Sequence, residues 1–354
     1  MYEQLGLDIS PREASILLGL LIGLAFGAMA EVSRFCFRRA IAGPLHERKS
    51  AAGVWLAGLA TAVIGTQLAV AQGLISFDEH RFMVADIPVV AIAVGGLIFG
   101  AGMVLTRGCV ARLTVLAGTG NLRAVLVLLT FAVIAHATLK GVLTPIRTAL
   151  SGVTLPLSSA ALPGSPLIWT ALIAGAAALA AWRFADNRRN LLLGALIGLL
   201  VPAAWIGTGY VLFDEFDPIA LEGISFTSPA TEALFWTVAS SAIPAGFGVG
   251  LLGGVIAGAL VLSLISGRFE WQSFSSPQQT GRYLGGAALM GVGGVLAGGC
   301  TIGAGLSGVP TLSIAAVLAL LSIGVGGALT ARLIGDGVSS TAADQATSSA
   351  PQAA

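Results

Sequence analysis

The sequence predicts an all-α polytopic membrane protein with about nine transmembrane helices, arranged as two inverted repeats with short re-entrant helices. Three observations predict this fold. The 354 residues are 56% hydrophobic and only 10% charged, whereas a soluble domain carries about 25% charged residues. Nine apolar runs are long enough to cross a bilayer, for which about 20 residues are needed. Finally, a glycine-rich decapeptide that ends in cysteine occurs once in each half of the chain.

The predicted spans divide the chain into two sets of four helices with one helix between them. The spans are expected at residues 14–32, 51–72, 87–106, 121–141, 166–184, 190–212, 244–266, 282–299 and 311–334. The connection 213–243 is amphipathic and contains Phe235 and Trp236, so we expect a short interfacial helix there. We treat 1–354 as a single membrane domain with these parts: repeat one at 14–141, a linker helix at 166–184, repeat two at 190–334 and a disordered tail at 335–354.

Basic residues are distributed unevenly between the two sides that these spans define. Fourteen Lys and Arg residues fall in segments on one side, and four fall on the other side. The four are Arg12, Arg81, Lys140 and Arg147. Because cytoplasmic loops carry the excess of Lys and Arg, we expect the N-terminus outside the cytoplasm and the C-terminus inside it. The formal net charge of +1 gives no indication of nucleic-acid binding.

The duplicated decapeptide relates the two halves. Gly100–Cys109 reads GAGMVLTRGC and Gly291–Cys300 reads GVGGVLAGGC, and six of the ten positions are identical. The first copy closes the third span and the second closes the eighth, so the copies run in opposite directions across the membrane. The sequence LIGL also occurs in both halves, at 21–24 and at 196–199. Inverted repeats with interrupted helices are typical of membrane transport domains.

A short segment of mixed polarity follows each repeated cysteine. The segments VARLTVLAGTGN and TIGAGLSGVPT are too short to span the membrane, and irregular backbone at membrane depth must line a cavity or be buried in protein. We therefore expect two re-entrant half-helices, whose first N–H groups favour an anion. With the adjoining thiols, they predict a site for a soft, sulfur-bearing anion formed by Cys109, Cys300, Gly108 and Gly299. In the alternative interpretation, the glycines only allow helices to approach and the cysteines are small packing residues.

The third cysteine, Cys36, follows the first span in the segment SRFCFRR. Arg34 lies closest to the membrane and three residues after Glu31, so the two side chains can pair on one helix face. Charges at membrane depth are costly and often functional, which makes Arg34 a candidate path residue. The alternative is that Arg34, like the arginines after it, only follows the positive-inside rule. Arg107 and Arg112, which flank Cys109, either attract an anion at the inner mouth or follow the same rule.

Three motifs together resemble the signatures of the YeeE/YedE family of bacterial membrane proteins. They are SRFCF, GMVLTRGCVARL with GTGNLRAV, and GGVLAGGCTIGAGLSG, and each contains one cysteine. The resemblance implies a thiosulfate uptake protein of the bacterial inner membrane. We expect no metal or other cofactor. By motif, Cys36, Cys109 and Cys300 would pass thiosulfate along by S–H hydrogen bonding. A cytoplasmic sulfur carrier of the TusA type is also implied as a partner, beside the membrane lipid.

The chain departs from the family pattern at two positions. Ala30-Glu31-Val32 precedes the SRFCF motif, where polar or basic residues are expected, and Arg107 stands where the second decapeptide has Gly298. A carboxylate beside an anion path is unfavourable unless it is paired or protonated. The ligand could accordingly be another sulfur or selenium anion.

A rival interpretation from another class is a membrane thiol–disulfide enzyme that uses Cys109 and Cys300 as a redox pair. Three cysteines without a C-x-x-C motif argue against it, and also against a disulfide framework or a zinc site. A role as a structural subunit or a receptor would not explain why the cysteine turn occurs in both halves of the chain. We therefore expect a transporter and not an enzyme.

Overall fold

The computed structural model of the protein describes residues 9–157 and 159–348. Within these residues, nine helices are long and apolar enough to cross a membrane, which confirms an all-α polytopic membrane protein. The long helices are α1 (Pro11–Ser33), α3 (Leu45–Ala71), α4 (Val89–Leu105), α6 (Leu122–Lys140), α8 (Pro166–Phe184), α9 (Arg188–Ile206) continued by η3 (Gly207–Val211), α11 (Phe247–Ile265), α12 (Pro277–Leu296) and α13 (Ile314–Ser348).

Short elements occupy the connections. They are α2 (Phe37–Ala42), η2 (Arg81–Met83), α5 (Val110–Gly118), α7 (Thr144–Ser151), α10 (Thr227–Val238), η4 (Thr301–Gly308) and η5 (Val309–Thr311). β1 (Asp86–Ile87) and β2 (Leu155–Pro156) form an antiparallel pair that ties two loops together. α5 and η4 are the two short helices predicted after the repeated cysteines, and α10 lies within the connection where a short interfacial helix was predicted.

Polar caps mark where several long helices begin. Ser10 and Glu13 form a capping box at the start of α1, whose first residue is Pro11, and this arrangement satisfies N–H groups that have no partner within the helix. The Asn121 side chain accepts a hydrogen bond from a backbone N–H at the start of α6, and the Ser276 side chain accepts one at the start of α12. These caps lie at the boundaries of apolar runs, so the spans begin close to their predicted positions.

Long helices of each half pack mainly against helices of the other half. α1 packs along α11 of the second half, and α9 packs along α3 of the first half. In the same manner α4 packs on α13 and α12 packs on α6, while α4 and α12 pack on each other. Each contact has its counterpart when the halves are interchanged, which is the pattern that two equivalent repeats produce.

Glycines allow the exchanged helices to touch along their backbones. A Cβ atom on Gly23 of α1 would clash with the carbonyl oxygen of Leu251, and one on Gly254 of α11 would clash with that of Leu20. In the other half, a Cβ atom on Gly198 of α9 would clash with the carbonyl oxygen of Gly58. Gly23 and Gly198 are the equivalent glycines of the two LIGL segments. Close packing through small residues is typical of membrane helices.

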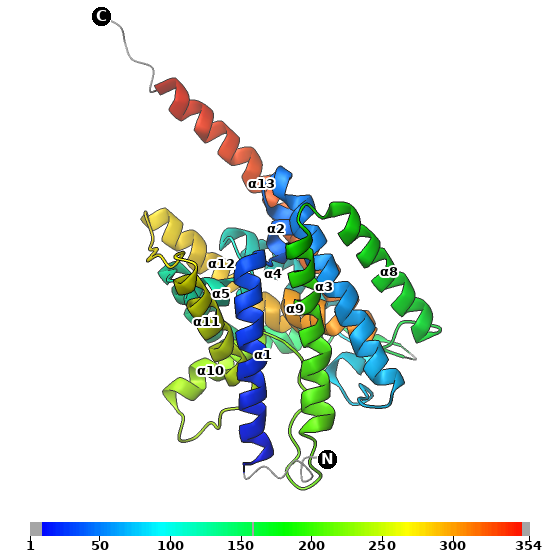
Figure 1. Ribbon diagram of the computed structural model, residues 1–354. Coiled ribbons are helices and arrows are strands. Elements are labelled where there is room, and N and C mark those ends of the chain that lie inside the picture. The colour runs from blue at the N-terminus through cyan, green and yellow to red at the C-terminus, as the bar shows by residue number, and fades with distance from the viewer. Residues whose placement is uncertain (1–8, 158, 349–354) are drawn as a thin grey trace, which may run out of the picture.

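The two ends of the bundle are distinct. In Figure 1, α1 begins at the lower end, where α10 also lies, and α13 leaves the upper end beside α2. α8 lies at the periphery against α3, and its large apolar side chains, such as Leu167 and Trp182, are exposed. α13 continues to Ser348, into the segment for which the sequence predicts disorder, and residues 349–354 lie outside the described residues.

Candidate functional site

All three cysteines follow the end of a long helix by the same kind of turn. The residue two positions before each cysteine has a left-handed backbone, with φ of 52° at Arg34, 59° at Arg107 and 72° at Gly298. Each cysteine then occupies the extended N-cap position of the next short element, which is α2, α5 or η4. The Cys36 turn therefore has the same form as the two turns of the repeated decapeptide.

The turns of α2, α5 and η4 meet inside the bundle. The thiols of Cys36 and Cys109 lie close enough to interact, and the Thr301 side chain lies near the Cys109 thiol. The Thr301 hydroxyl is buried and has no hydrogen-bond partner among the described residues. All three cysteines are free and buried, with exposures of 4% for Cys36, 2% for Cys109 and 1% for Cys300. Residues more than 250 positions apart in sequence thus come together inside the bundle. We call Cys36, Cys109 and Thr301, together with Cys300, which precedes Thr301 in the chain, the thiol cluster.

The cysteines differ in whether the sulfur accepts a hydrogen bond from the first turn of the helix that follows. The Cys300 sulfur accepts a hydrogen bond of 3.4 Å from the backbone N–H of Gly303. Cys36 and Cys109 make no side-chain cap hydrogen bond. Because the first N–H groups of a helix have no partner within it, the N-terminus of α5 keeps donors beside the thiol of Cys109.

Two glycines predicted for the site have different environments. A Cβ atom on Gly299 would come within 2.9 Å of the Ala304 backbone nitrogen, so this position needs glycine for the chain to fold back onto η4. A Cβ atom on Gly108 would meet only side chains, at 3.3 Å or more. The Gly108 carbonyl accepts a hydrogen bond of 2.9 Å from Thr106, which fixes the turn before Cys109.

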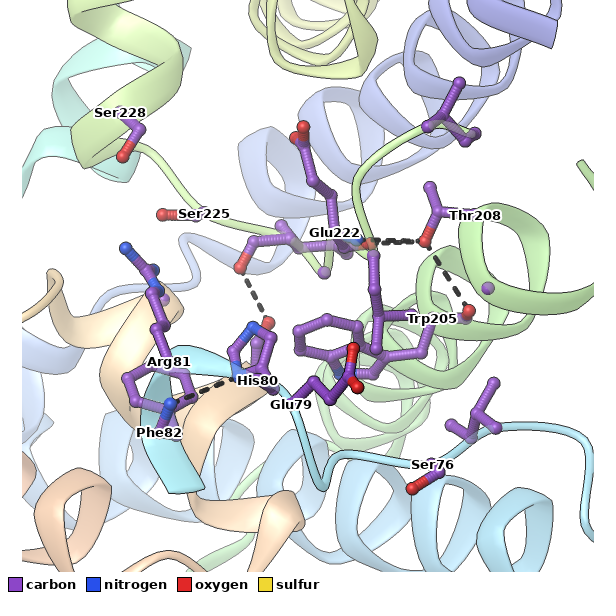
Figure 2. A pocket seen from close by; sticks show the side chains of 18 of the residues that line it. Ser76, Glu79, His80, Arg81, Phe82, Trp205, Thr208, Glu222, Ser225 and Ser228 are labelled. Atoms are coloured by element: carbon purple, nitrogen blue, oxygen red, sulfur yellow. Dashed lines mark hydrogen bonds between the residues drawn. The ribbon is translucent and has the colours of Figure 1, made fainter. Parts of the chain in front are cut away.

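A cavity of about 810 Å³ opens between the α3–α4 loop, the end of α9 and the segment that leads into α10. Figure 2 shows His80 and Arg81 on the first of these segments and Glu222 and Ser225 on the third. Gly303 and Ser307 of η4 also line the cavity, so it reaches the short helix that begins at Cys300. Its segments belong to the end of the molecule where α1 begins.

The polar groups of the cavity are only partly compensated. The Ser225 hydroxyl is buried and has no hydrogen-bond partner among the described residues. By contrast, the Ser307 hydroxyl donates to the Ile224 carbonyl at 2.6 Å. Arg81 lies close enough to Cys300, Glu222 and Glu232 for electrostatic interaction. The cavity therefore places the Ser225 hydroxyl and the Arg81 guanidinium near η4, the short helix that begins after Cys300.

Burial changes the protonation of the cavity's titratable groups. Burial, with a smaller contribution from Glu232, raises the pKa of Glu222 to about 7. The pKa of Glu232 is also raised, mainly by burial. Burial and the adjacent Arg81 lower the pKa of His80 to about 4, so the imidazole is neutral near pH 7. Its Nδ1 accepts a hydrogen bond of 3.3 Å from Phe82 N–H, which leaves the proton on Nε2.

The opposite side of the thiol cluster is basic. Arg112, one turn into α5, and Arg38 both lie close enough to Cys36 for electrostatic interaction. Arg112 pairs with Glu31 at 3.6 Å, and Arg268 approaches the same carboxylate at 3.9 Å. The expected pairing of Glu31 with Arg34 is wrong, because α1 ends at Ser33 and the left-handed turn at Arg34 takes its side chain off the helix face.

The predicted site residues are therefore only partly brought together. Cys36 and Cys109 meet directly, Cys300 lies beside Thr301 of the same cluster, and Gly108 and Gly299 form the two repeat turns. Arg34 has an exposed side chain, and its backbone carbonyl accepts a hydrogen bond of 3.1 Å from Arg39. The thiol near Cys109 belongs to Cys36, whereas the redox interpretation pairs Cys109 with Cys300.

Sequence reasoning did not single out the residues that line the cavity. Arg81 is one of the four basic residues on its side of the membrane, and no motif in the sequence marks Glu222 or Glu232. The scarcity of basic residues on that side could have drawn attention to Arg81. Ser225 and Thr301 carry no signal of their own, since their importance arises only from the packing of η4.

Comparison with known proteins places most of the chain in one family. The family model described as sulphur transport matches residues 32–329. A thiosulfate transporter TsuA from Spirochaeta thermophila is 26% identical over 319 residues, which cover 85% of this chain and 93% of that protein. A thiosulfate transporter TsuA from Escherichia coli is 26% identical over 320 residues, covering 82% of this chain and 86% of that protein.

Proposed function

Because the chain belongs to the sulphur transport family, we propose that it is a membrane transporter that imports thiosulfate into the cytoplasm. Two similar proteins named thiosulfate transporter align over more than four fifths of this chain. We further propose that thiosulfate passes the thiol cluster without covalent chemistry. The protein then acts as a transporter and not as an enzyme.

The observation that carries the proposed path is the buried meeting of Cys36, Cys109 and Thr301. Moving an ion out of water costs several kcal/mol even after the protein relaxes, so an anion inside the bundle needs replacement donors at each step. Thiols, hydroxyls and the uncapped N–H groups of α5 are donors without a fixed charge. Such donors compensate the dianion while binding it weakly enough to let it leave.

The path begins in the cavity that opens at the end where α1 begins. Arg81 and the unpartnered Ser225 hydroxyl would receive the anion, and Gly303 would bring it to the helix that Cys300 caps. From Cys300 the anion would reach Thr301 and then the thiols of Cys109 and Cys36. Beyond them lie the basic side chains of Arg38 and Arg112, toward which an anion is drawn.

The proposed orientation of the protein in the membrane rests on the distribution of basic residues. Fourteen Lys and Arg residues lie on the side that we assign to the cytoplasm. We place the protein in the bacterial inner membrane, with the N-terminus and the cavity on the periplasmic or extracellular side and the C-terminus in the cytoplasm. A small sulfur-carrier protein of the TusA type is the proposed cytoplasmic partner. Such a partner would remove thiosulfate as it emerges and so favour net inward movement.

The test is uptake of labelled thiosulfate by cells that lack other sulfate and thiosulfate importers. Cells with the protein should show saturable uptake, and the variants Cys36→Ala, Cys109→Ala and Cys300→Ala should each lose most of it. Thr138→Ala is a matched control, because Thr138 is small, fully buried and hydrogen-bonded only to its own helix. This control should keep wild-type uptake.

Serine variants separate transport from redox chemistry. A hydroxyl still donates a hydrogen bond but cannot form a disulfide, so Cys109→Ser should retain part of the uptake. Complete loss in every serine variant, with a trapped mixed disulfide in the wild type, would favour the membrane thiol–disulfide enzyme. Absence of thiosulfate uptake despite normal membrane expression would direct attention to other sulfur or selenium anions.

A further inference from the structure

A buried carboxylate lies beside the thiol cluster, where an anion path should avoid one. Glu31 is in the last turn of α1 and is 7% exposed. Its Oε2 atom is 3.6 Å from Arg112 Nη1, and its Oε1 atom is 3.9 Å from Arg268 Nη1. Charge-assisted hydrogen bonds are about 2.7–2.9 Å long. Glu31 is thus neutralised by two guanidinium groups without a close hydrogen bond to either.

A second ion pair of the same region shows the contrast. Arg39 and Glu47 approach to 2.7 Å, with two hydrogen bonds to one carboxylate oxygen. This closer pair is more exposed than the Glu31 pair, with side-chain exposures of 23% and 34%. The Oε2 atom of Glu31 is buried and has no hydrogen-bond partner among the described residues. The more buried pair is therefore the less completely satisfied one.

Arg112 connects this carboxylate to the thiol cluster. It lies three residues after Cys109 on α5, its side chain is 14% exposed, and it interacts electrostatically with Cys36. Its Nη1 atom donates to the Ala30 carbonyl at 3.2 Å. A guanidinium has five N–H donors in a planar fork, and this bond is the one hydrogen bond that the Arg112 side chain makes within the described part of the chain. Donors that fit the oxygens of an anion remain.

We propose that Arg112 is a binding residue for the oxyanion end of the substrate at the inner side of the thiol cluster, and that Glu31 is its resident partner, which the substrate displaces. This inference rests on the proposed function and identifies a further contact for the same dianion. Arg guanidinium groups bind oxyanions with two parallel hydrogen bonds. The loose contact to Glu31 keeps Arg112 neutralised while the site is empty.

Glu31 also explains how a dianion can leave a buried arginine. An unopposed buried guanidinium would hold the anion too tightly for transport, since conduction needs binding weak enough for release. When Glu31 returns to Arg112, it competes with the anion and promotes its release. Arg268, with a side chain 42% exposed before α12, stays near Glu31 and can neutralise it while Arg112 holds the substrate.

The kinetics of thiosulfate uptake test this role. Glu31→Gln removes the competing charge, so the half-saturating thiosulfate concentration should fall by about tenfold, which corresponds to a modest coupling between two sites. The maximal rate should fall as well, because release becomes slow. Arg112→Gln should raise the half-saturating concentration at least as strongly or abolish uptake. Glu47→Gln removes a carboxylate from the exposed pair and should leave both quantities unchanged.

The double variant Glu31→Gln/Arg112→Gln distinguishes a binding residue from a simple counter-ion. If Arg112 only neutralises Glu31, removing both charges should restore uptake; this result would overturn the inference. If Arg112 binds the substrate, the double variant should stay as impaired as Arg112→Gln. Detergent size-exclusion profiles report whether each variant folds. If the Arg112 variants do not fold, Glu31→Gln alone decides, because an unchanged half-saturating concentration contradicts the displacement of Glu31.

The same experiment separates this inference from the proposed function. Wild-type uptake that depends on the cysteines but not on Glu31 or Arg112 would overturn the inference alone. Absence of thiosulfate uptake by the wild-type protein would overturn both.

Discussion

Arg107 and Gly298 occupy the same left-handed backbone conformation, with φ of 59° and 72°, two residues before Cys109 and Cys300. In the aligned decapeptides they are the position where arginine replaces glycine. A side chain at positive φ is strained, and glycine is not. The two turns thus have the same geometry, although only the second copy has the residue best suited to it.

These two positions give a matched pair of stability tests. No heavy atom lies within 4 Å of a Cβ placed on Gly298, so Gly298→Ala should cost about 1 kcal/mol through backbone strain alone. Arg107→Gly should relieve the corresponding strain and raise the free energy of unfolding by a smaller amount, since glycine also gains entropy in the unfolded chain. Thermal unfolding in detergent measures both. If both variants changed the free energy of unfolding equally and in the same direction, the left-handed conformation at these two positions would be contradicted.

Adjacent glycines on α11 test the exchanged helix packing. Gly254→Ala should destabilise the protein by about 1–3 kcal/mol, because the new methyl group would meet the backbone of α1 at Leu20. Gly253→Ala is the control, since nothing lies within 4 Å of its Cβ position, and it should be neutral or slightly stabilising. The melting temperatures of the two variants should therefore differ clearly. Similar melting temperatures would mean that α1 and α11 are not in backbone contact.

Uptake should increase as the external pH falls from 8 to 6. The pKa of Glu222 is raised to about 7, so this carboxylate is charged at pH 8 and takes up a proton toward pH 6, removing a negative charge that repels a dianion. Charge in a cleft changes association rates by about tenfold or more. We expect the uptake rate to rise by up to about tenfold between pH 8 and pH 6. The Glu222→Gln variant should show no such rise.

Several other charged groups face Glu222 or lie near it. Arg81 and Glu232 interact with it directly, Lys140 acts on Glu232, and Asp78, Glu79 and His80 line the same cavity. The pKa of His80, about 4, keeps it neutral throughout this range. Glu79→Gln alters an exposed carboxylate and should preserve the pH profile. A pH profile unchanged in Glu222→Gln would assign the effect to another group.

Ser225 and Ser307 should separate binding from stability. Ser225→Ala removes a buried hydroxyl without a partner, so stability should be maintained or improved by about 1 kcal/mol, while the half-saturating thiosulfate concentration rises. Ser307→Ala removes the hydrogen bond to the Ile224 carbonyl and should cost about 1 kcal/mol of stability. Thermal unfolding and uptake kinetics on both variants check this. A loss of stability in Ser225→Ala would show that its hydroxyl has a structural partner.

The membrane spans could be predicted from the sequence because apolar length is a local property. The limits 166–184 coincide with α8, and the predicted span 87–106 differs by only a few residues from α4. The short helices after Cys109 and Cys300 were predictable too, because the repeated decapeptide marked where each preceding helix stops. Both arguments use residues that are close together in sequence.

Contacts between distant segments could not be predicted in this way. Glu31 was expected to pair with Arg34 by helical spacing, yet its partners are Arg112 and Arg268, which lie on other elements. No sequence pattern indicated that Cys36 would meet Cys109, because the first turn lies outside the repeated decapeptide. The unpaired state of Ser225 likewise depends on how η4 packs against the loop before α10.

The exchange of helices between the halves also bears on how the protein can move. α1 packs along α11, and α9 packs along α3, with backbone against backbone. The first long helix of each half is thus packed into the other half. Two interlocked halves cannot rock past one another as separate rigid blocks without breaking these seams. If the proposed path is correct, we expect its opening and closing to be local, at the three cysteine turns and the side chains around them.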